Sequence, residues 1–381
     1  MKLAVATTFD ARDVSNWSGT PFYMSKAFEK EGVEVQYIGN LKKRVSPFFK
    51  LKQTWKSLAS GQRESPRFNI INAKNYSAQA AEKLKSLNVD AVIAPQIHPI
   101  CYLDSDKPII LWTDGLYASL IGFYPGFSQH SASSIAQGNI ITKECLNRCS
   151  LAIFSSDWAA NTATEIYGSD KNKVKVIPFG ANIEKRNTLE DIQAMLKIRS
   201  HKTVKLLFLG KSWERKGGEI VFNVAKKLHE QGQAVELNFV GCHPPQGFVI
   251  PEYIKCHGFI SKRTPEGVEK ITKLLKESHF LFVPSRAEAY GIVFCEANAF
   301  ALPCLTSYVG GISTIVKNNI NGMTFALDAP VDVYCEYITH LMQNYSRYEE
   351  MALNSFNEFE TRLNWKTAAS EVKKLIEEIT N

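Results

Sequence analysis

The chain has 381 residues, of which 45% are apolar and 22% charged, and its net charge is +7. A globular chain of this length exceeds a single hydrophobic core and is expected to form two domains. It contains no run of about 18 apolar residues, so no transmembrane helix is expected. The opening MKLAVATTFDARD reaches acidic and polar residues too early for a signal peptide and is typical of a first strand.

The eight cysteines include no C-x-x-C pair. This argues against a zinc site and against a secreted disulfide framework, and it favours free thiols in a reducing cytosol. Cytoplasmic localisation is therefore expected.

Residues 41–67 hold eight lysines and arginines against the single acid Glu64, interleaved with aromatic and aliphatic residues such as Trp55. Such a stretch suits peripheral contact with an anionic membrane surface. The alternative is a solvent-exposed helical segment with a few aromatic side chains that face the core. Nucleic-acid binding is not expected, because no recognised binding module accompanies the charge.

Strand-like runs alternate with helical patterns along the first half. Strands are predicted at 3–8, 33–39, 91–95, 109–113, 151–155 and 174–178. Helices are predicted at 21–30, 78–87, 132–148 and 158–167. This alternation indicates a parallel α/β architecture.

A second series follows, with strands predicted at 204–210, 235–241, 253–260, 280–284 and 303–307. Helices are predicted at 219–231, 265–277, 294–301, 312–316 and 365–380. The polar, weakly patterned stretch 182–202 is the best boundary candidate. We therefore predict a first domain over 1–185, a second over 186–360 and a terminal helix over 361–381 that crosses back to the first domain or packs on the second.

In doubly wound sheets, ligands bind beyond the carboxyl ends of the strands. Several informative residues follow predicted strands. In the first half they are Gly19 and Thr20, which lead into the first helix, and Asp114. In the second half, Gly210-Lys211 ends a strand and Arg215-Lys216-Gly217-Gly218 is predicted to open the next helix.

The segment EAYGIVFCE, residues 288–296, carries two carboxylates eight positions apart with Gly291 between them. Gly291 and Ile292 stand where a helix begins, and backbone N–H groups at a helix start can face an anion. Glu288 precedes this turn, and Glu296 lies about one and a half turns into the helix. Carboxylates on both sides of an anion site suit a ligand with hydroxyls flanking a phosphate, such as a nucleotide sugar.

Each of these residues has a structural alternative. Glu288 could cap the following helix, and Glu296 could be an exposed helix residue. The apolar surroundings of Glu296, VFCEANAFALP, instead imply that its carboxylate needs a partner, which a ribose diol would provide. The case for Asp114 is weaker, because acids at strand-end turns are common, and His98 is more often structural than catalytic.

Cleavage of a sugar–phosphate bond leaves negative charge on a diphosphate, which must be stabilised electrostatically. No D-x-D pair stands where a magnesium site would be expected, so no metal is predicted. Lys216, with Arg215 or Lys211, can supply the positive charge instead. The alternative is that these are solvated charges, but cations at a helix start oppose the macrodipole and therefore need a reason.

Several segments resemble retaining glycosyltransferases of family four. The stretch PSRAEAYGIVFCEANAFALPCLTSYVGGISTIVKNNINGMTF is similar to their donor-binding signature, with its E-x7-E pattern. FLGKSWERKGGEIVFNVAKKL resembles their phosphate-binding segment, and CHGFISK resembles their base-binding loop. The resemblance also includes VIPFGANIE as a hinge and the amino-terminal loop, and it is weak between residues 41 and 100.

The resemblance implies the GT-B architecture: α/β, two Rossmann-like doubly wound parallel-sheet domains facing a central cleft. It implies retaining, metal-independent transfer of a sugar from a nucleotide-diphosphate sugar to an acceptor hydroxyl, without a cofactor, in glycan, polysaccharide or glycolipid biosynthesis. Glu288 would bind the transferred sugar and Glu296 the ribose. Lys216, Gly291 and Ile292 would meet the phosphates.

The resemblance further implies that Phe259 and Ile260 flank the base. This chain departs from the family pattern at two positions. Lysine at position 211 stands where the family commonly has arginine, so Arg215 would share its role. The strand end WTDGLY places Asp114 in the region of a common first-domain histidine.

Three other functions remain open. A GT-B relative without transfer activity, such as a sugar-nucleotide epimerase or hydrolase, would act without an acceptor. A nicotinamide-dependent enzyme is disfavoured by the absence of G-x-G-x-x-G after either domain's first strand. A non-catalytic nucleotide-sugar-binding protein would not need Glu288 and Lys216. The sequence leaves the nucleobase, the sugar and the acceptor undetermined.

Overall fold

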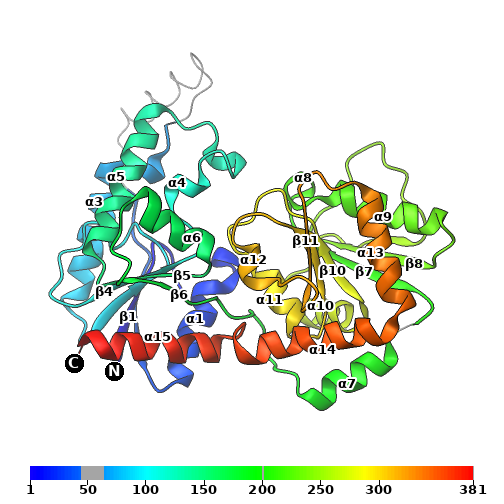
Figure 1. Ribbon diagram of the computed structural model, residues 1–381. Helices are drawn as coiled ribbons and strands as arrows, with labels where there is room; N and C mark the ends of the chain where they lie inside the picture. Colours follow the sequence, from blue (N-terminus) through cyan, green and yellow to red (C-terminus); the bar gives the residue numbers. More distant parts are fainter. Residues whose placement is uncertain (44–63, 200, 381) are drawn as a thin grey trace. The chain divides into compact units, whose positions relative to one another are not determined.

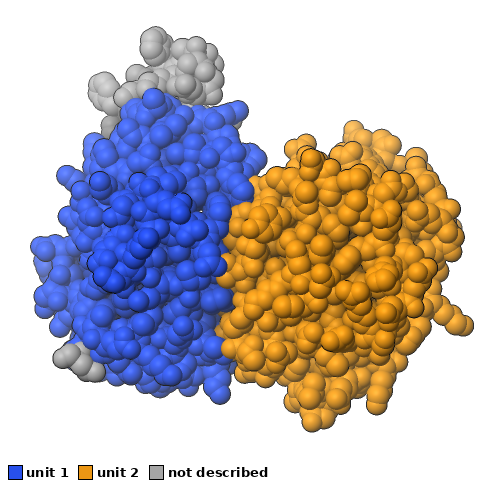
Figure 2. Space-filling view, viewed as in Figure 1, with its two compact units in different colours: residues 1–179, 365–381 blue, residues 180–364 orange. Residues whose placement is uncertain are grey.

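The computed structural model describes residues 1–43, 64–199 and 201–380. The chain forms two compact units: residues 1–179 with 365–381, and residues 180–364 (Figures 1 and 2). We call them unit 1 and unit 2. The basic stretch 41–67 falls mostly outside the described residues, so its contact with a membrane stays a prediction. Among the described helices, none has the length and apolar character needed to cross a bilayer.

Unit 1 is built on a parallel sheet that has six strands within the described residues, in the order β2-β1-β3-β4-β5-β6. The strands are β1 (Lys2–Ala6), β2 (Glu34–Ile38), β3 (Ala91–Ala94), β4 (Ile109–Thr113), β5 (Leu151–Phe154) and β6 (Val174–Val176). The central ones are continuous apolar runs such as AVIA and LAIF with every residue buried. Such runs are expected where helices cover both faces of a parallel sheet.

The helices of unit 1 are α1 (Thr20–Lys30), α3 (Ile70–Leu84), α4 (Tyr117–Leu120), α5 (Ala132–Arg148), α6 (Asp157–Asn161) and α15 (Trp365–Thr380). A π-helix, Thr162–Ile166, continues α6, and short 3₁₀ turns span Asn16–Gly19, Pro66–Phe68 and Pro125–Phe127. Alternate strand residues point to opposite faces. Ala94 and Phe154 join one core cluster with Ile141 of α5.

The other face of this sheet carries α1 and α15, which lie side by side (Figure 1). The ring of Trp112 on β4 is 6.1 Å from that of Phe28 on α1 and 5.6 Å from that of Trp365 on α15, centroid to centroid. The Lys373 ammonium donates to the Glu31 carbonyl at 2.9 Å. The last helix therefore completes the core of unit 1.

Unit 2 is built on a second parallel sheet, again six-stranded in the described residues, in the order β12-β11-β10-β7-β8-β9. The strands are β7 (Val204–Leu209), β8 (Val235–Val240), β9 (Ile254–Cys256), β10 (Phe280–Val283), β11 (Cys304–Ser307) and β12 (Gly322–Phe325). The helices are α7 (Leu189–Ile198), α8 (Trp213–Lys216), α9 (Gly218–Glu230), α10 (Pro265–Glu277), α11 (Ile292–Asn298), α12 (Ile312–Ile315), α13 (Val331–Gln343) and α14 (Tyr345–Thr361). Both units thus have the doubly wound α/β architecture that the sequence predicts.

Several elements differ from the predictions. The stretch 182–202, predicted to be weakly patterned, contains α7, which begins with a capping box between Thr188 and Asp191. Helix α3 starts eight residues before the predicted position, where Asn69 caps it by accepting from the Ile71 and Asn72 N–H groups. The predicted strand 253–260 ends at Cys256, which leaves residues 257–264 as a loop.

Candidate functional site

The strand order of unit 2 reverses direction between β7 and β10. From β7 the chain proceeds to β8 on one side, and from β10 it proceeds to β11 on the other. Such a switch point opens a crevice beyond the carboxyl ends of the two strands, where ligands of doubly wound sheets bind. The loops that follow β7 and β10 meet there, because the Arg286 N–H donates to the Arg215 carbonyl at 2.7 Å.

Gly217 makes this close approach of the two loops possible. Its φ is +74°, and a Cβ at this position would lie 2.2 Å from the Pro284 carbonyl oxygen. An alanine would therefore meet both an unfavourable backbone conformation and a backbone clash. The glycine is required by the contact between the turn into α9 and the end of β10.

Lys216, Arg215 and Glu288 come together at the switch point. The Lys216 ammonium donates to Glu288 Oε2, and Arg215 Nη1 lies 3.4 Å from the same oxygen. Arg215 also donates to the Ala287 carbonyl at 2.8 Å. Only 10% of the Lys216 side chain and 12% of the Glu288 side chain are exposed. Two cations around one largely buried carboxylate oxygen form a site suited to an additional anion.

The prediction that Arg215 and Lys216 open a helix is wrong. Both lie in the last turn of α8, and α9 begins after them at Gly218. The macrodipole of α8 favours cations at this end, so their position does not by itself require a bound phosphate. The argument for an anion site rests instead on their convergence with Glu288.

Glu296 is held by a residue that the sequence did not single out. Glu296 lies on α11 with 4% of its surface exposed. The Lys262 ammonium, from the 257–264 loop, lies 2.6 Å from its Oε1. A buried carboxylate needs such a partner, as its apolar sequence context predicts. Lys262 falls within the CHGFISK segment, but 34 residues separate it from Glu296, so no local pattern reveals the pair.

Phe259 and Lys211 form an exposed platform next to this loop. The Phe259 side chain is 65% exposed, and the Lys211 ammonium lies 4.8 Å from the centroid of its ring. Ile260, the next residue, is half-buried. An exposed aromatic face with a cation over it is suited to stacking against a flat, electron-rich ring.

The turn into α11 is built around Gly291. Its φ is +93°, and a Cβ there would lie 2.6 Å from the Phe294 ring. Gly291 is the N-cap of α11 and provides no side-chain cap for the helix that Ile292 begins. The first N–H groups of a helix have no partner within the helix. The N–H groups at the start of α11 therefore lie between Glu288 and Glu296 in the sequence.

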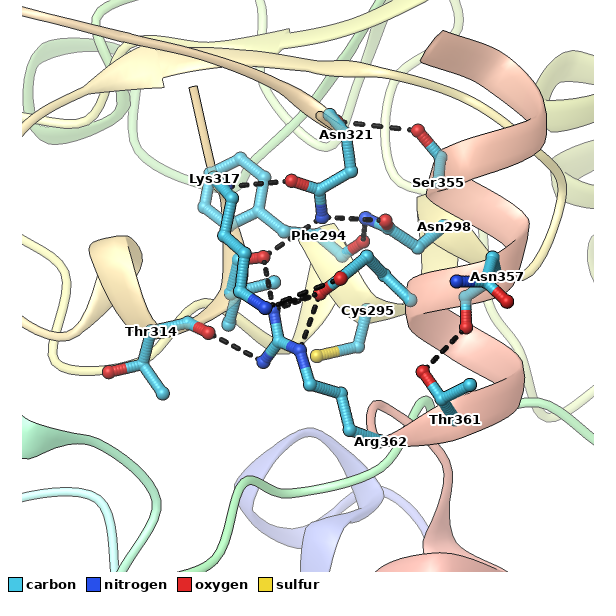
Figure 3. A network of polar contacts seen from close by, with 12 residues as sticks. Phe294, Cys295, Asn298, Thr314, Lys317, Asn321, Ser355, Asn357, Thr361 and Arg362 are labelled. Carbon is cyan, nitrogen blue, oxygen red and sulfur yellow. Dashed lines mark hydrogen bonds and ion pairs between the residues drawn. The ribbon is translucent and has the colours of Figure 1, made fainter. Parts of the chain in front are cut away.

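A polar network behind α11 fixes the end of that helix (Figure 3). Asn298, its last residue, donates to the Phe294 carbonyl at 2.6 Å and accepts from Asn321 at 2.9 Å. Asn321 in turn donates to the Ile315 carbonyl at 2.9 Å. α11 is thus joined through buried amides to the turn that follows α12.

The same network reaches α14 through Glu358. Its carboxylate pairs with Lys317 at 3.2 Å and with Arg362 one turn later. Arg362 also donates to the Thr314 carbonyl at 2.6 Å. Arg362 therefore satisfies a carbonyl at the end of α12, where helices leave such groups without intrahelical partners.

Unit 1 contains the remaining predicted site residues. Gly19, with φ +87°, is the N-cap of α1, and Thr20 begins that helix. Asp114 follows β4 and is half-buried. Burial lowers the pKa of Arg67, and the negative charge of Asp114 partly opposes this effect. Arg67 is a neighbour of Asp114 that the sequence did not identify.

His98 is buried, and this burial together with the positive charge of Arg67 lowers its pKa to about 3. Its ring packs 5.5 Å from that of Phe68. A histidine with this pKa stays neutral at physiological pH, which supports the structural interpretation over general acid–base catalysis.

Comparison with known proteins shows what most of unit 2 is similar to. Residues 203–344 match the family described as Glycosyl transferases group 1. A D-inositol 3-phosphate glycosyltransferase of Nocardia farcinica is 26% identical over 180 residues, which are 43% of this chain and 40% of that protein. The chain thus matches less than half the length of this curated relative.

Solved structures resemble the whole chain in fold. The sucrose-phosphate synthase of Thermosynechococcus elongatus has a TM-score of 0.71 and 15% identity, and the match covers 100% of this chain and 99% of that one. Anabaena HepE in complex with UDP-glucose has a TM-score of 0.62 and 15% identity, over 99% of this chain and 100% of that one. Two Rossmann-like units in one chain, together with the likeness to these solved structures, confirm the predicted GT-B fold class. Residues 203–344 thus match the Glycosyl transferases group 1 family, and the whole chain shares the fold of these solved structures.

Proposed function

We propose that this protein is a retaining, metal-independent glycosyltransferase that moves a sugar from a nucleotide-diphosphate sugar to an acceptor hydroxyl. The observation that carries the proposal is the convergence of Lys216, Arg215 and Glu288 at the switch point of unit 2. Support comes from the family match over 203–344 and from the buried carboxylate of Glu296 on the adjoining helix.

The cluster would act on the donor as follows. The diphosphate takes the positive charge of Lys216 and Arg215, which releases the Glu288 carboxylate to accept hydrogen bonds from hydroxyls of the transferred sugar. The bond between the anomeric carbon and the phosphate oxygen then breaks, and the two cations stabilise the charge on the leaving diphosphate. N–H groups at the start of α11, near Gly291 and Ile292, would add to this stabilisation.

The acceptor hydroxyl attacks the same face of the sugar that the phosphate leaves. Its proton passes to the departing phosphate oxygen, so atoms and charge balance without a separate base. Glu296 anchors the ribose, while Phe259 and Ile260 flank the base.

The similar proteins suggest which donor and which acceptor to test first. A HepE structure contains UDP-glucose, so a uridine diphosphate sugar is the first donor to test. The curated relative from Nocardia farcinica is named for D-inositol 3-phosphate. A polyol phosphate is therefore the first acceptor to test, with saccharides and lipid-linked glycans after it.

The test combines a binding screen with a product assay. UDP-, GDP-, ADP- and dTDP-sugars are screened by thermal shift, and the stabilising donor is incubated with candidate acceptors in the presence and absence of EDTA. Transfer with retained anomeric configuration, unaffected by EDTA, is expected. Release of free sugar or an epimerised nucleotide sugar without acceptor would favour the epimerase or hydrolase alternative. Absence of any nucleotide-sugar binding would overturn the proposal.

A further inference from the structure

Glu296 and Lys262 form an ion pair that joins two elements of unit 2. The two residues are 34 positions apart in the sequence. The carboxylate belongs to α11, and the ammonium belongs to the loop between β9 and α10. Their heavy atoms are 2.6 Å apart, and the side chain of Glu296 is 6% exposed whereas that of Lys262 is 40% exposed. The carboxylate is thus buried, and its cation reaches it from the solvent side.

The loop that carries Lys262 is held at both ends. At its start, the His257 N–H donates to the Phe239 carbonyl at 2.8 Å and the Gly241 N–H donates to the Gly258 carbonyl at 2.8 Å. At its end, Thr264 caps α10 by accepting from the Gly267 N–H at 3.2 Å. Lys262 therefore extends toward Glu296 from an anchored backbone.

The geometry leaves Glu296 able to accept further hydrogen bonds. Lys262 contacts Oε1, and a carboxylate has about four lone-pair sites on its two oxygens. Two adjacent hydroxyls of a ribose could donate to these sites while Lys262 remains in place. Without the ammonium, the buried carboxylate would lose its charge partner and its fixed orientation.

We infer that Lys262 is a positioning residue that holds the Glu296 carboxylate ready for the 2′- and 3′-hydroxyls of a nucleotide. The inference rests on the proposed function and extends it to selection between ribose and 2′-deoxyribose. A site whose buried polar group is matched to a substrate hydroxyl rejects the analogue that lacks this hydroxyl, because the group is then left unpaired. Lys262 contributes to this selection through Glu296.

The experiment measures binding of UDP, GDP and ADP, each beside its 2′-deoxy analogue, by isothermal titration calorimetry with the full chain. The wild type is expected to bind its preferred diphosphate at least about 10-fold more tightly than the 2′-deoxy form, as loss of a hydrogen bond to a charged group predicts. Lys262→Met, which keeps the aliphatic stem, should bring this ratio close to one by weakening ribose binding alone. Lys262→Arg, which keeps a cation, should restore much of the ratio.

Lys273→Ala is the matched control, because Lys273 is a lysine on α10 with a 73% exposed side chain. It should leave the ratio at the wild-type value. Equal weakening of both nucleotides by Lys262→Met would show a general effect on the loop and would overturn the inference. An unchanged ratio in Lys262→Met, or equal wild-type affinity for ribose and deoxyribose forms, would also overturn it while leaving the proposed function intact. No binding of any nucleotide by the wild type would overturn the proposed function, and the inference with it.

Discussion

At the scale of single residues, the candidate site of unit 2 is organised by pairing of opposite charges. Lys216 and Arg215 meet Glu288, and Lys262 meets Glu296. Each carboxylate is largely buried, where an isolated charge would be costly. The side chains of the protein thus neutralise one another's charges at the positions where we propose that a donor binds. Binding would exchange partners at Glu288 and add hydrogen bonds at Glu296.

Glu288→Gln should separate donor binding from transfer. The variant removes the negative charge that Lys216 and Arg215 share, so we expect affinity for the nucleoside diphosphate to be retained or increased. Transfer should fall by about 100-fold or more, as for removal of a group that acts in the transition state. Calorimetry and steady-state kinetics measure the two effects. Glu230→Gln, on the exposed end of α9, serves as control.

A weaker diphosphate affinity in Glu288→Gln would contradict the partner exchange. Transfer close to the wild-type rate would contradict the role of Glu288 with the sugar.

His98 should make unit 1 sensitive to acid. Its pKa in the folded chain is about 3, below the ordinary value of 6.5, because burial disfavours the charged form. Between these pH values the unfolded chain binds more protons, so the free energy of unfolding falls as pH decreases, by about 1.4 kcal/mol per pH unit. Urea unfolding at pH 7.5 and 5.5 should show a smaller loss for His98→Gln than for the wild type. The same loss in both proteins would refute this assignment.

At the scale of elements, the site depends on how loops and helices are joined around the switch point. The turn into α9 touches the end of β10 through Gly217, and α11 is fixed behind the site by Asn298. Buried hydrogen bonds of this kind contribute modestly to stability when made and cost more when one partner is removed. Substitutions outside the cluster of Lys216, Arg215 and Glu288 should therefore affect this cluster by shifting the backbone that carries it.

Gly217→Ala and Gly232→Ala form a matched pair for this effect. Both glycines have similar positive φ values, +74° and +82°, but a Cβ at Gly232 meets nothing within 4 Å. Gly232→Ala should cost about 1–2 kcal/mol in backbone strain and leave nucleotide affinity unchanged. Gly217→Ala should cost more and weaken nucleotide binding by about 10- to 100-fold, because the loop must move. Thermal unfolding and calorimetry measure both, and identical behaviour of the two variants would contradict the steric argument.

Arg199 anchors the far end of α11. Although 2% exposed, it donates to the carbonyls of Phe300 and Ala301 at 2.7 Å each and to the Tyr348 hydroxyl at 2.8 Å. Arg199→Met leaves these carbonyls without their donor and should destabilise unit 2 by about 3 kcal/mol.

Tyr348→Phe removes one of these bonds and should cost about 1 kcal/mol. Urea unfolding measures both variants. If Arg199→Met were no more destabilising than Tyr348→Phe, the anchoring role would be wrong.

At the scale of the whole molecule, the chain passes through unit 2 and returns to unit 1. Unit 2 is continuous over 180–364, whereas unit 1 requires 365–381. Trp365 stacks on Phe179 with their ring centroids 5.5 Å apart and meets the edge of Trp112. Mutations in α15 should thus affect unit 1 while the candidate-site residues of unit 2 keep their contacts.

Trp365→Ala should destabilise unit 1 by about 3–5 kcal/mol, as for other buried aromatic residues replaced by alanine. The increase in melting temperature on adding the nucleoside diphosphate should persist. Lys366→Ala, at an exposed position on the same helix, is the control. Loss of nucleotide stabilisation in a still folded Trp365→Ala protein would show that unit 1 contributes to donor binding.

The sequence by itself determined the two α/β units, most of the strands and the elements that carry Glu288 and Glu296. These depend on apolar runs, glycine turns and helix periodicity, which are local. It also identified Lys216, although it placed this residue at the wrong end of a helix because the four-residue α8 is too short to show a period. Helix α7 was not predicted, because the polar stretch 182–202 showed no clear helical period.

Only the tertiary structure decided which charges meet. The pairs Lys216–Glu288 and Lys262–Glu296 join positions 72 and 34 residues apart, and parallel strands bring them to one edge of the sheet. Only the tertiary structure likewise brings Arg67 near Asp114 and Arg199 to the carbonyls of Phe300 and Ala301, just after α11. Such partners are set by strand order and by loop closure, which no local pattern encodes.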